Sequence, residues 1–160
     1  MRSHIIDIEV DVSNGLHSFT IVGLPDKAVE ESRDRVSSAI KNSGFTSPKS
    51  KNQKVVVSLA PADIKKEGPL FDLPIALAYL LATEEISFDT DKKIFFGELS
   101  LDGKLRPIKG ALLLTLAAKK HGFDEIFLPK ENAEEAALVG GITIYGVETL
   151  LEIIDHIDTK

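Results

Sequence analysis

The chain has 160 residues, 43% of them hydrophobic, which is enough for one domain with a core and too few for two ordinary domains. Charged residues make up 28% of the sequence and cysteine is absent, which excludes an intrinsically disordered chain, disulfides, thiolate metal sites and cysteine nucleophiles. The formal net charge of −6 argues against a surface built chiefly to neutralise phosphates, because nonspecific binding of nucleic acid depends on lysine and arginine.

Strand and helix patterns alternate in the first 60 residues. Apolar and acidic residues alternate over 6–12, the period of a strand with one wet face. Val29, Val36 and Ile40 form one apolar stripe at helical spacing. The expected elements are a hairpin of strands 6–12 and 19–22 joined by a turn at 13–15, one helix from Pro25 to about 43, a polar loop at 47–52 and a strand at 55–59.

The rest of the chain begins with a connection over 60–72 that is rich in proline, glycine and charge. We expect Asp72 to cap the N-terminus of an apolar helix that ends at Ala82. The elements expected after it are a hairpin of strands 94–99 and 105–108, a helix at 110–120 buried on nearly every face, a strand at 125–128, a helix at 131–138, a strand at 142–145 and a helix at 147–157. This mixture predicts one layered α/β or α+β domain over residues 1–160.

The longest apolar stretch, around residues 73–82, is about half the roughly 20 residues that cross a hydrocarbon core. The N-terminus also lacks the apolar run and small-residue cleavage site of a secretory signal. We therefore expect a cytoplasmic protein with no membrane partner.

Sequence motifs for nucleotide binding and for metal binding are missing. The stretch 97–104 has two glycines and a lysine, but Leu105 and Pro107 follow it where a phosphate loop needs a hydroxyl residue and a helix. We therefore expect a hairpin there. Dinucleotide and nucleophile-elbow patterns are also absent. The four histidines are scattered and predict no metal site; they are His4, His17, His121 and His156.

Positive charge concentrates in one part of this acidic chain. These residues are candidates for contact with DNA phosphates or an acidic partner, although a solvated loop is the alternative because no aromatic residue lies between the lysines to stack on bases. The candidates are Arg33, Arg35, Lys49, Lys51, Lys54, Lys65 and Lys66, with Lys41 close by in the sequence.

Three segments, 18–36, 59–74 and 97–107, together resemble the N-terminal domain of Mg-chelatase-like, competence-associated AAA+ proteins of the ComM type. The resemblance covers nearly the whole chain. It implies a ribosomal-protein-S5-domain-2-like fold, shared with the proteolytic domain of Lon and with the C-terminal domain of the recombination ATPase RadA.

The resemblance also locates the two positions at which Lon-type proteolysis places its serine nucleophile and lysine base. Leu70 occupies the first and Leu112 the second, and neither side chain can attack or accept a proton. This predicts a domain without peptidase activity. A rescue by Lys109 with Thr115 or Ser100 would need contact at hydrogen-bonding distance, which the spacing does not predict.

In the family that this chain resembles, an AAA+ module with the phosphate loop follows the domain, and we expect that module to be absent from this chain. The resemblance implies a hexameric parent ATPase that uses ATP and magnesium and drives DNA branch migration in natural transformation. For this domain itself we expect no cofactor. Three hypotheses result: an assembly and substrate-positioning module, a DNA-binding module, or a peptidase with a different dyad.

Overall fold

The computed structural model describes residues 5–160, and its chain begins with a three-stranded sheet. Strands β1 (Asp7–Asn14), β2 (Ser18–Val22) and β3 (Gln53–Ala60) lie in the order β1-β3-β2, with β3 antiparallel to β1 and parallel to β2. The predicted hairpin is therefore wrong. Strand β3 buries Val55, Val57 and Leu59, so the most apolar strand occupies the centre, where both of its edges are hydrogen-bonded.

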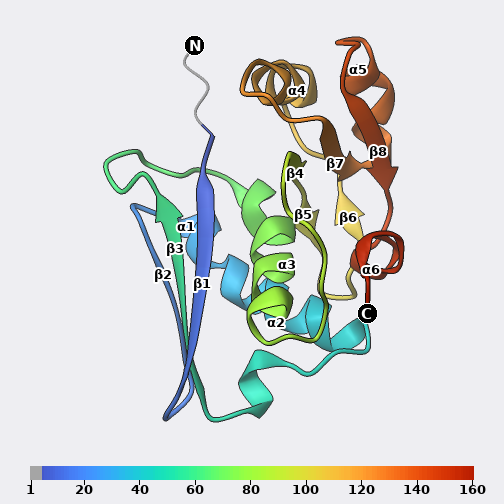
Figure 1. The fold of residues 1–160 in the computed structure, drawn as a ribbon. Coiled ribbons are helices and arrows are strands. Elements are labelled where there is room, and N and C mark those ends of the chain that lie inside the picture. The colour runs from blue at the N-terminus through green and yellow to red at the C-terminus, as the bar shows by residue number, and fades with distance from the viewer. Residues whose placement is uncertain (1–4) are drawn as a thin grey trace.

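Three helices cover one face of this first sheet and lie between it and a second sheet (Figure 1). They are α1 (Lys27–Glu30), α2 (Ser32–Asn42) and α3 (Asp72–Ala82), with the 3₁₀ turns η1 (Pro48–Ser50) and η2 (Pro69–Phe71) in the connections. The predicted single helix from Pro25 divides at Glu31, but its apolar stripe of Val29, Val36 and Ile40 is fully buried, as expected.

The second sheet is parallel and contains β4 (Lys93–Phe95), β7 (Glu125–Pro129) and β8 (Thr143–Val147) in the order β4-β7-β8. A small antiparallel ladder of β5 (Glu98–Leu99) and β6 (Leu105–Arg106) follows β4. The continuous strand predicted at 94–99 is wrong, because Gly97 leaves the ladder: its N–H donates to Leu70 O at 2.9 Å and its carbonyl accepts from Leu73 N at 3.0 Å.

Helices α4 (Ala111–Lys120), α5 (Ala133–Ala137) and α6 (Leu150–Ile157) complete the structure, with the 3₁₀ turn η3 (Lys130–Asn132) before α5. Figure 1 shows α4 and α5 together at one end of the second sheet. Helix α4 is less buried than predicted, because Leu113 and Leu116 are 50% and 47% exposed.

A large hydrophobic core fills the space between the first sheet, α2, α3 and α6, and a smaller one lies around Phe96, Ile126 and Leu128. The aromatic rings of Phe95, Phe127 and Tyr145 stack along the second sheet with centroids 4.7 and 4.6 Å apart. The mixture of parallel and antiparallel sheets with helices confirms the predicted α/β class. Within residues 5–160, no helix has the length and apolar character to cross a bilayer.

Candidate functional site

The two leucines that the resemblance predicts at the Lon-type dyad positions lie in different parts of the fold. Leu70 lies in η2 and is half-buried, and Leu112 lies in the first turn of α4, where its N–H donates to Glu135 Oε2 at 3.3 Å. Leu70 lines an open groove of about 360 Å³. Its walls come mainly from aliphatic and aromatic side chains of β1, α3, β4 and α4, among them Leu77, Phe95 and Leu114.

The polar side chains on that groove do not form a nucleophile and base pair. They are Asp7, Thr90 and Lys93, and the ammonium group of Lys93 lies 3.5 Å from the Glu125 carboxylate. A hydroxyl becomes a nucleophile when a neighbouring base accepts its proton, whereas the ammonium group of Lys93 is paired with a carboxylate and has no hydrogen bond to the Thr90 hydroxyl among the described residues.

The residues of the rescue hypothesis, Lys109, Thr115 and Ser100, share no hydrogen bond in the described part of the chain. The Thr115 hydroxyl is fully buried and donates to Ala111 O at 2.7 Å within α4. Ser100 lies in the turn between β5 and β6, and Lys109 is exposed before α4.

A buried carboxylate at the start of α3 is the most strongly bonded polar group of the interior. Asp72 accepts hydrogen bonds from Arg35 Nε at 2.6 Å, Arg35 Nη2 at 3.0 Å, the Ser32 hydroxyl at 2.5 Å and Leu99 N–H at 3.0 Å. The predicted N-cap role of Asp72 is wrong, since Phe71 occupies the cap position and the carboxylate turns toward α2 and β5 instead. Burial raises the pKa of Asp72, and the bonds from Arg35 and Ser32 oppose that rise.

The loop between β3 and α3 is fastened to the segment that leads into α1. Asp26 Oδ1 accepts from Val29 N at 2.8 Å and Asp26 Oδ2 accepts from Gly68 N at 3.0 Å. Backbone bonds of 2.9 Å join Asp26 N to Lys66 O and Lys66 N to Leu24 O. The side chain of Lys66 is 1% exposed, and its ammonium group donates to Pro61 O. Two of the three segments that carry the family resemblance therefore meet here.

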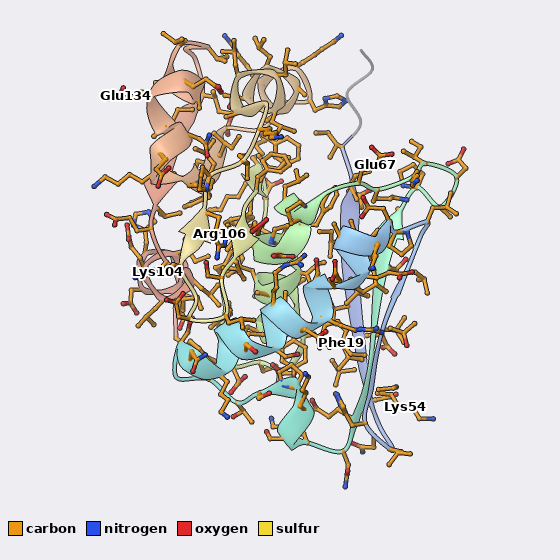
Figure 2. The ribbon with its side chains drawn as sticks, turned by 180° about the vertical axis from the view of Figure 1, so that it is seen from behind. Phe19, Lys54, Glu67, Lys104, Arg106 and Glu134 are labelled. Atoms are coloured by element: carbon orange, nitrogen blue, oxygen red, sulfur yellow. The ribbon has the colours of Figure 1, made fainter. Side chains whose placement is uncertain are left out.

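The cations predicted as contacts for DNA or a partner do not form one surface. The guanidinium of Arg35 is bonded to Asp72 and to Ala28 O, and Lys66 is buried, so both point into the protein. Arg33, Lys49, Lys54 and Lys65 are exposed and Lys51 is half-buried. Figure 2 shows Lys54 and Glu67 at opposite ends of the first sheet, so Lys49–Lys54 and Lys65 are separated by the length of β3, about 25 Å.

Metal-binding geometry is absent from the described residues, which contain no group of three or more His, Asp or Glu side chains able to hold an ion. His17 contacts Gln53 O at 3.1 Å, His121 contacts Ala117 O at 2.8 Å, and His156 lies against the ring of Tyr145. His4 lies outside the described residues.

Comparison with known proteins adds relatives to this geometry. Residues 8–132 match the family model described as subunit ChlI of Mg-chelatase. The competence protein ComM of Haemophilus influenzae is 41% identical over 159 residues, which cover 99% of this chain and 30% of that protein. The uncharacterized protein YifB of Escherichia coli is 44% identical over 137 residues, covering 85% of this chain and 26% of that protein.

A more distant relative connects the chain to a protease. Lon protease 2 of Thermus thermophilus is 29% identical over 160 residues, which cover 94% of this chain and 20% of that protein. This relation agrees with the Lon-like fold expected from the sequence. The chain spans less than a third of the length of each of these relatives.

Proposed function

The chain belongs to the family of subunit ChlI of Mg-chelatase. From this premise we propose that the chain is a non-catalytic module that assembles with an AAA+ ATPase and positions partners or substrate. The observation that carries this proposal is the pair Leu70 and Leu112. The family resemblance places these leucines where a Lon-type enzyme needs its nucleophile and its base. Leu70 also lines a groove of apolar character.

An exposed apolar stripe on α4 supports the assembly part of the proposal. Leu113 and Leu116 are three residues apart, so they lie on one face of the helix, and both are about half exposed. A pair of adjacent exposed leucines favours burial against another protein surface, because each buried leucine contributes about 2 kcal/mol.

For the longer parent protein, we propose a cytoplasmic hexameric ATPase that binds ATP and magnesium in its AAA+ module. The name of the Haemophilus influenzae relative, a competence protein, supports a role in natural transformation, and DNA branch migration is the activity we propose for the parent.

The first experiment tests for peptidase activity. The chain is incubated with fluorescein-labelled casein beside its Lys109→Ala variant, which removes the remaining base of the rescue hypothesis. We expect both to match the buffer blank. Turnover above the blank that disappears in Lys109→Ala would refute the non-catalytic assignment.

The second experiment tests assembly in the full-length parent. Sedimentation of the Leu113→Asp, Leu116→Asp double variant should show a smaller assembly than the unmodified protein. Leu16→Asp is the matched control, since Leu16 is 85% exposed and lies in the loop between β1 and β2. Equal sedimentation of all three proteins would contradict the role of α4.

The alternative of a DNA-binding module is less favoured, because Arg35 and Lys66 are engaged inside the protein and the other candidate lysines divide between the two ends of the first sheet. Fluorescence anisotropy with single-stranded, duplex and branched DNA at several salt concentrations tests it. Salt-sensitive binding that is lost when Lys49, Lys51 and Lys54 become Glu would make DNA contact the better assignment.

A further inference from the structure

A hollow on the surface between the C-terminal half of α2 and the turn η1 has an unusual lining. Its volume is about 430 Å³, and only hydroxyl and ammonium side chains surround it. The lining residues are Ser37, Ser38, Lys41, Thr46, Ser47, Lys49 and Ser50. Neither a carboxylate nor an apolar side chain belongs to this set, although the chain as a whole has a net charge of −6.

Hydrogen bonds among the lining residues hold the walls of the hollow in place and leave some hydroxyl groups without a partner among residues 5–160. Ser50 Oγ donates to Ser47 O at 2.8 Å, and Ser47 Oγ accepts from Lys49 N at 3.2 Å, so these hydroxyls hold the turn η1 in shape. In the described part of the chain, no hydrogen bond uses the hydroxyl groups of Ser38 and Thr46.

The two lysines bring positive charge to the same space. Lys41 takes part in no ion pair among residues 5–160. The ammonium group of Lys49 lies 3.2 Å from Asp34 Oδ1, in a pair whose side chains are 57% and 64% exposed. An exposed pair of this kind is weak, so a better acceptor can take Lys49 from Asp34.

We propose that this hollow binds a phosphate group. The hydroxyl protons of Ser37 and Ser50 are already donated to backbone carbonyls. A phosphate offers acceptor oxygens and negative charge to the donors that are left on the lining, which are the hydroxyl groups of Ser38 and Thr46 and the two ammonium groups, and charge-assisted bonds of this type are the strong ones.

The Asp34 carboxylate competes with phosphate for Lys49, and the Glu85 carboxylate, which accepts from Thr46 N at 3.2 Å, adds negative charge nearby. We therefore expect a dissociation constant on the order of millimolar. This inference is independent of the scaffold role proposed above.

Two sources supply the same chemistry: a free phosphate compound, or a phosphodiester of a nucleic-acid strand. The hollow lies at the same end of the first sheet as Lys51, which directly follows η1, and Lys54, the second residue of β3. These cations would extend contact along a nucleic-acid strand. The experiment distinguishes the two sources.

The test is a titration followed by amide chemical shifts in two-dimensional ¹H–¹⁵N NMR, with sodium chloride adjusted to hold ionic strength constant. Inorganic phosphate should shift the amides of residues 37–41 and 46–50 and approach saturation near about 10 mM. Lys41→Ala should weaken binding about tenfold and Asp34→Asn should strengthen it. Lys120→Ala is the matched control, since Lys120 is also an exposed lysine in the last turn of a helix.

Each outcome decides the proposal. Saturable shifts with phosphate alone assign the hollow to free phosphate compounds, whereas shifts with an oligonucleotide that lacks terminal phosphates, at lower concentration, assign it to a nucleic-acid backbone. An absence of saturable shifts with both ligands overturns the site. Equal weakening by Lys41→Ala and Lys120→Ala overturns it as well, because it would reduce the effect to overall charge.

Discussion

Replacing Arg35 by methionine should destabilise the fold more at high pH than at low pH. The change removes two hydrogen bonds, of 2.6 and 3.0 Å, from a carboxylate with no exposed side-chain surface. Breaking a buried pair from one side costs about 3–5 kcal/mol. The lower end, about 3 kcal/mol, is expected, because Asp72 keeps its bonds from Ser32 and Leu99 and because the Arg35 side chain is itself 20% exposed.

The pH dependence follows from the direction of the Asp72 shift. Burial already raises the pKa of Asp72, so the folded state binds this proton more tightly than the unfolded state does. Stability from such a group is fully present below the ordinary pKa of 3.8 and is lost as pH rises through the folded value. The Arg35→Met change removes the cation that opposes the shift, so the destabilisation should be larger at about pH 8 than at about pH 5.

Urea unfolding followed by circular dichroism measures these free energies, and a double-mutant cycle isolates the pair. Asp72→Asn alone should cost about 2 kcal/mol. The double variant should cost about 3 kcal/mol, well below the sum of the two single changes, because it leaves no unpaired charge. Additivity within about 0.5 kcal/mol, or a cost of Arg35→Met that does not change with pH, would refute the coupling.

Three further predictions follow from single contacts. Lys66→Ala should lower the free energy of unfolding by about 2 kcal/mol, because the packing of a buried aliphatic stem is lost. Lys65→Ala on the surface should change it by less than about 0.5 kcal/mol. Equal values for the two variants in urea unfolding would contradict the burial of Lys66. Gly23→Ala should destabilise the fold by more than about 3 kcal/mol in thermal unfolding, since the new Cβ would lie 2.1 Å from a carbonyl oxygen of β3. Gly122 also has a positive φ but lies in open space, so Gly122→Ala should cost about 1 kcal/mol in the same measurement. Burial, with a contribution from a nearby carboxylate, raises the pKa of Tyr79 from 10.0 to about 12, so stability should be lost as pH rises from about 10 to 12. Ultraviolet titration should show a tyrosine with a pKa of about 12 that is absent in Tyr79→Phe, whose remaining tyrosine is Tyr145.

The predictions about local structure were confirmed where the pattern was strong. Alternation over residues 6–12 and the buried stripe of α2 are consequences of side-chain periodicity, which a strand or a helix imposes whatever packs against it. The leucines at positions 70 and 112 are also a property of the sequence, and the lack of a dyad that they imply stays a prediction.

The local sequence pattern could not predict which strands pair or which side chains bind each other across the fold. A turn at 13–15 is compatible with a hairpin, but β3 enters between its two strands, because burial of Val55, Val57 and Leu59 depends on residues about 40 positions away in the chain. Asp72 has the sequence context of a helix cap, yet it binds Arg35 and the backbone of β5, which only the packing of α2 against α3 brings within reach.

Taken by itself, the sequence determined the class of fold and the family, because both are written in residue type and short-range spacing. The absence of a Lon-type nucleophile and base stays a prediction from the residues at positions 70 and 112. Tertiary structure alone decided which cations face solvent. Arg35, Lys49 and Lys66 are all cationic residues in the sequence. In the structure Arg35 is paired with a buried carboxylate, Lys49 lines an open hollow and Lys66 is enclosed, since exposure depends on segments that approach each other only after folding.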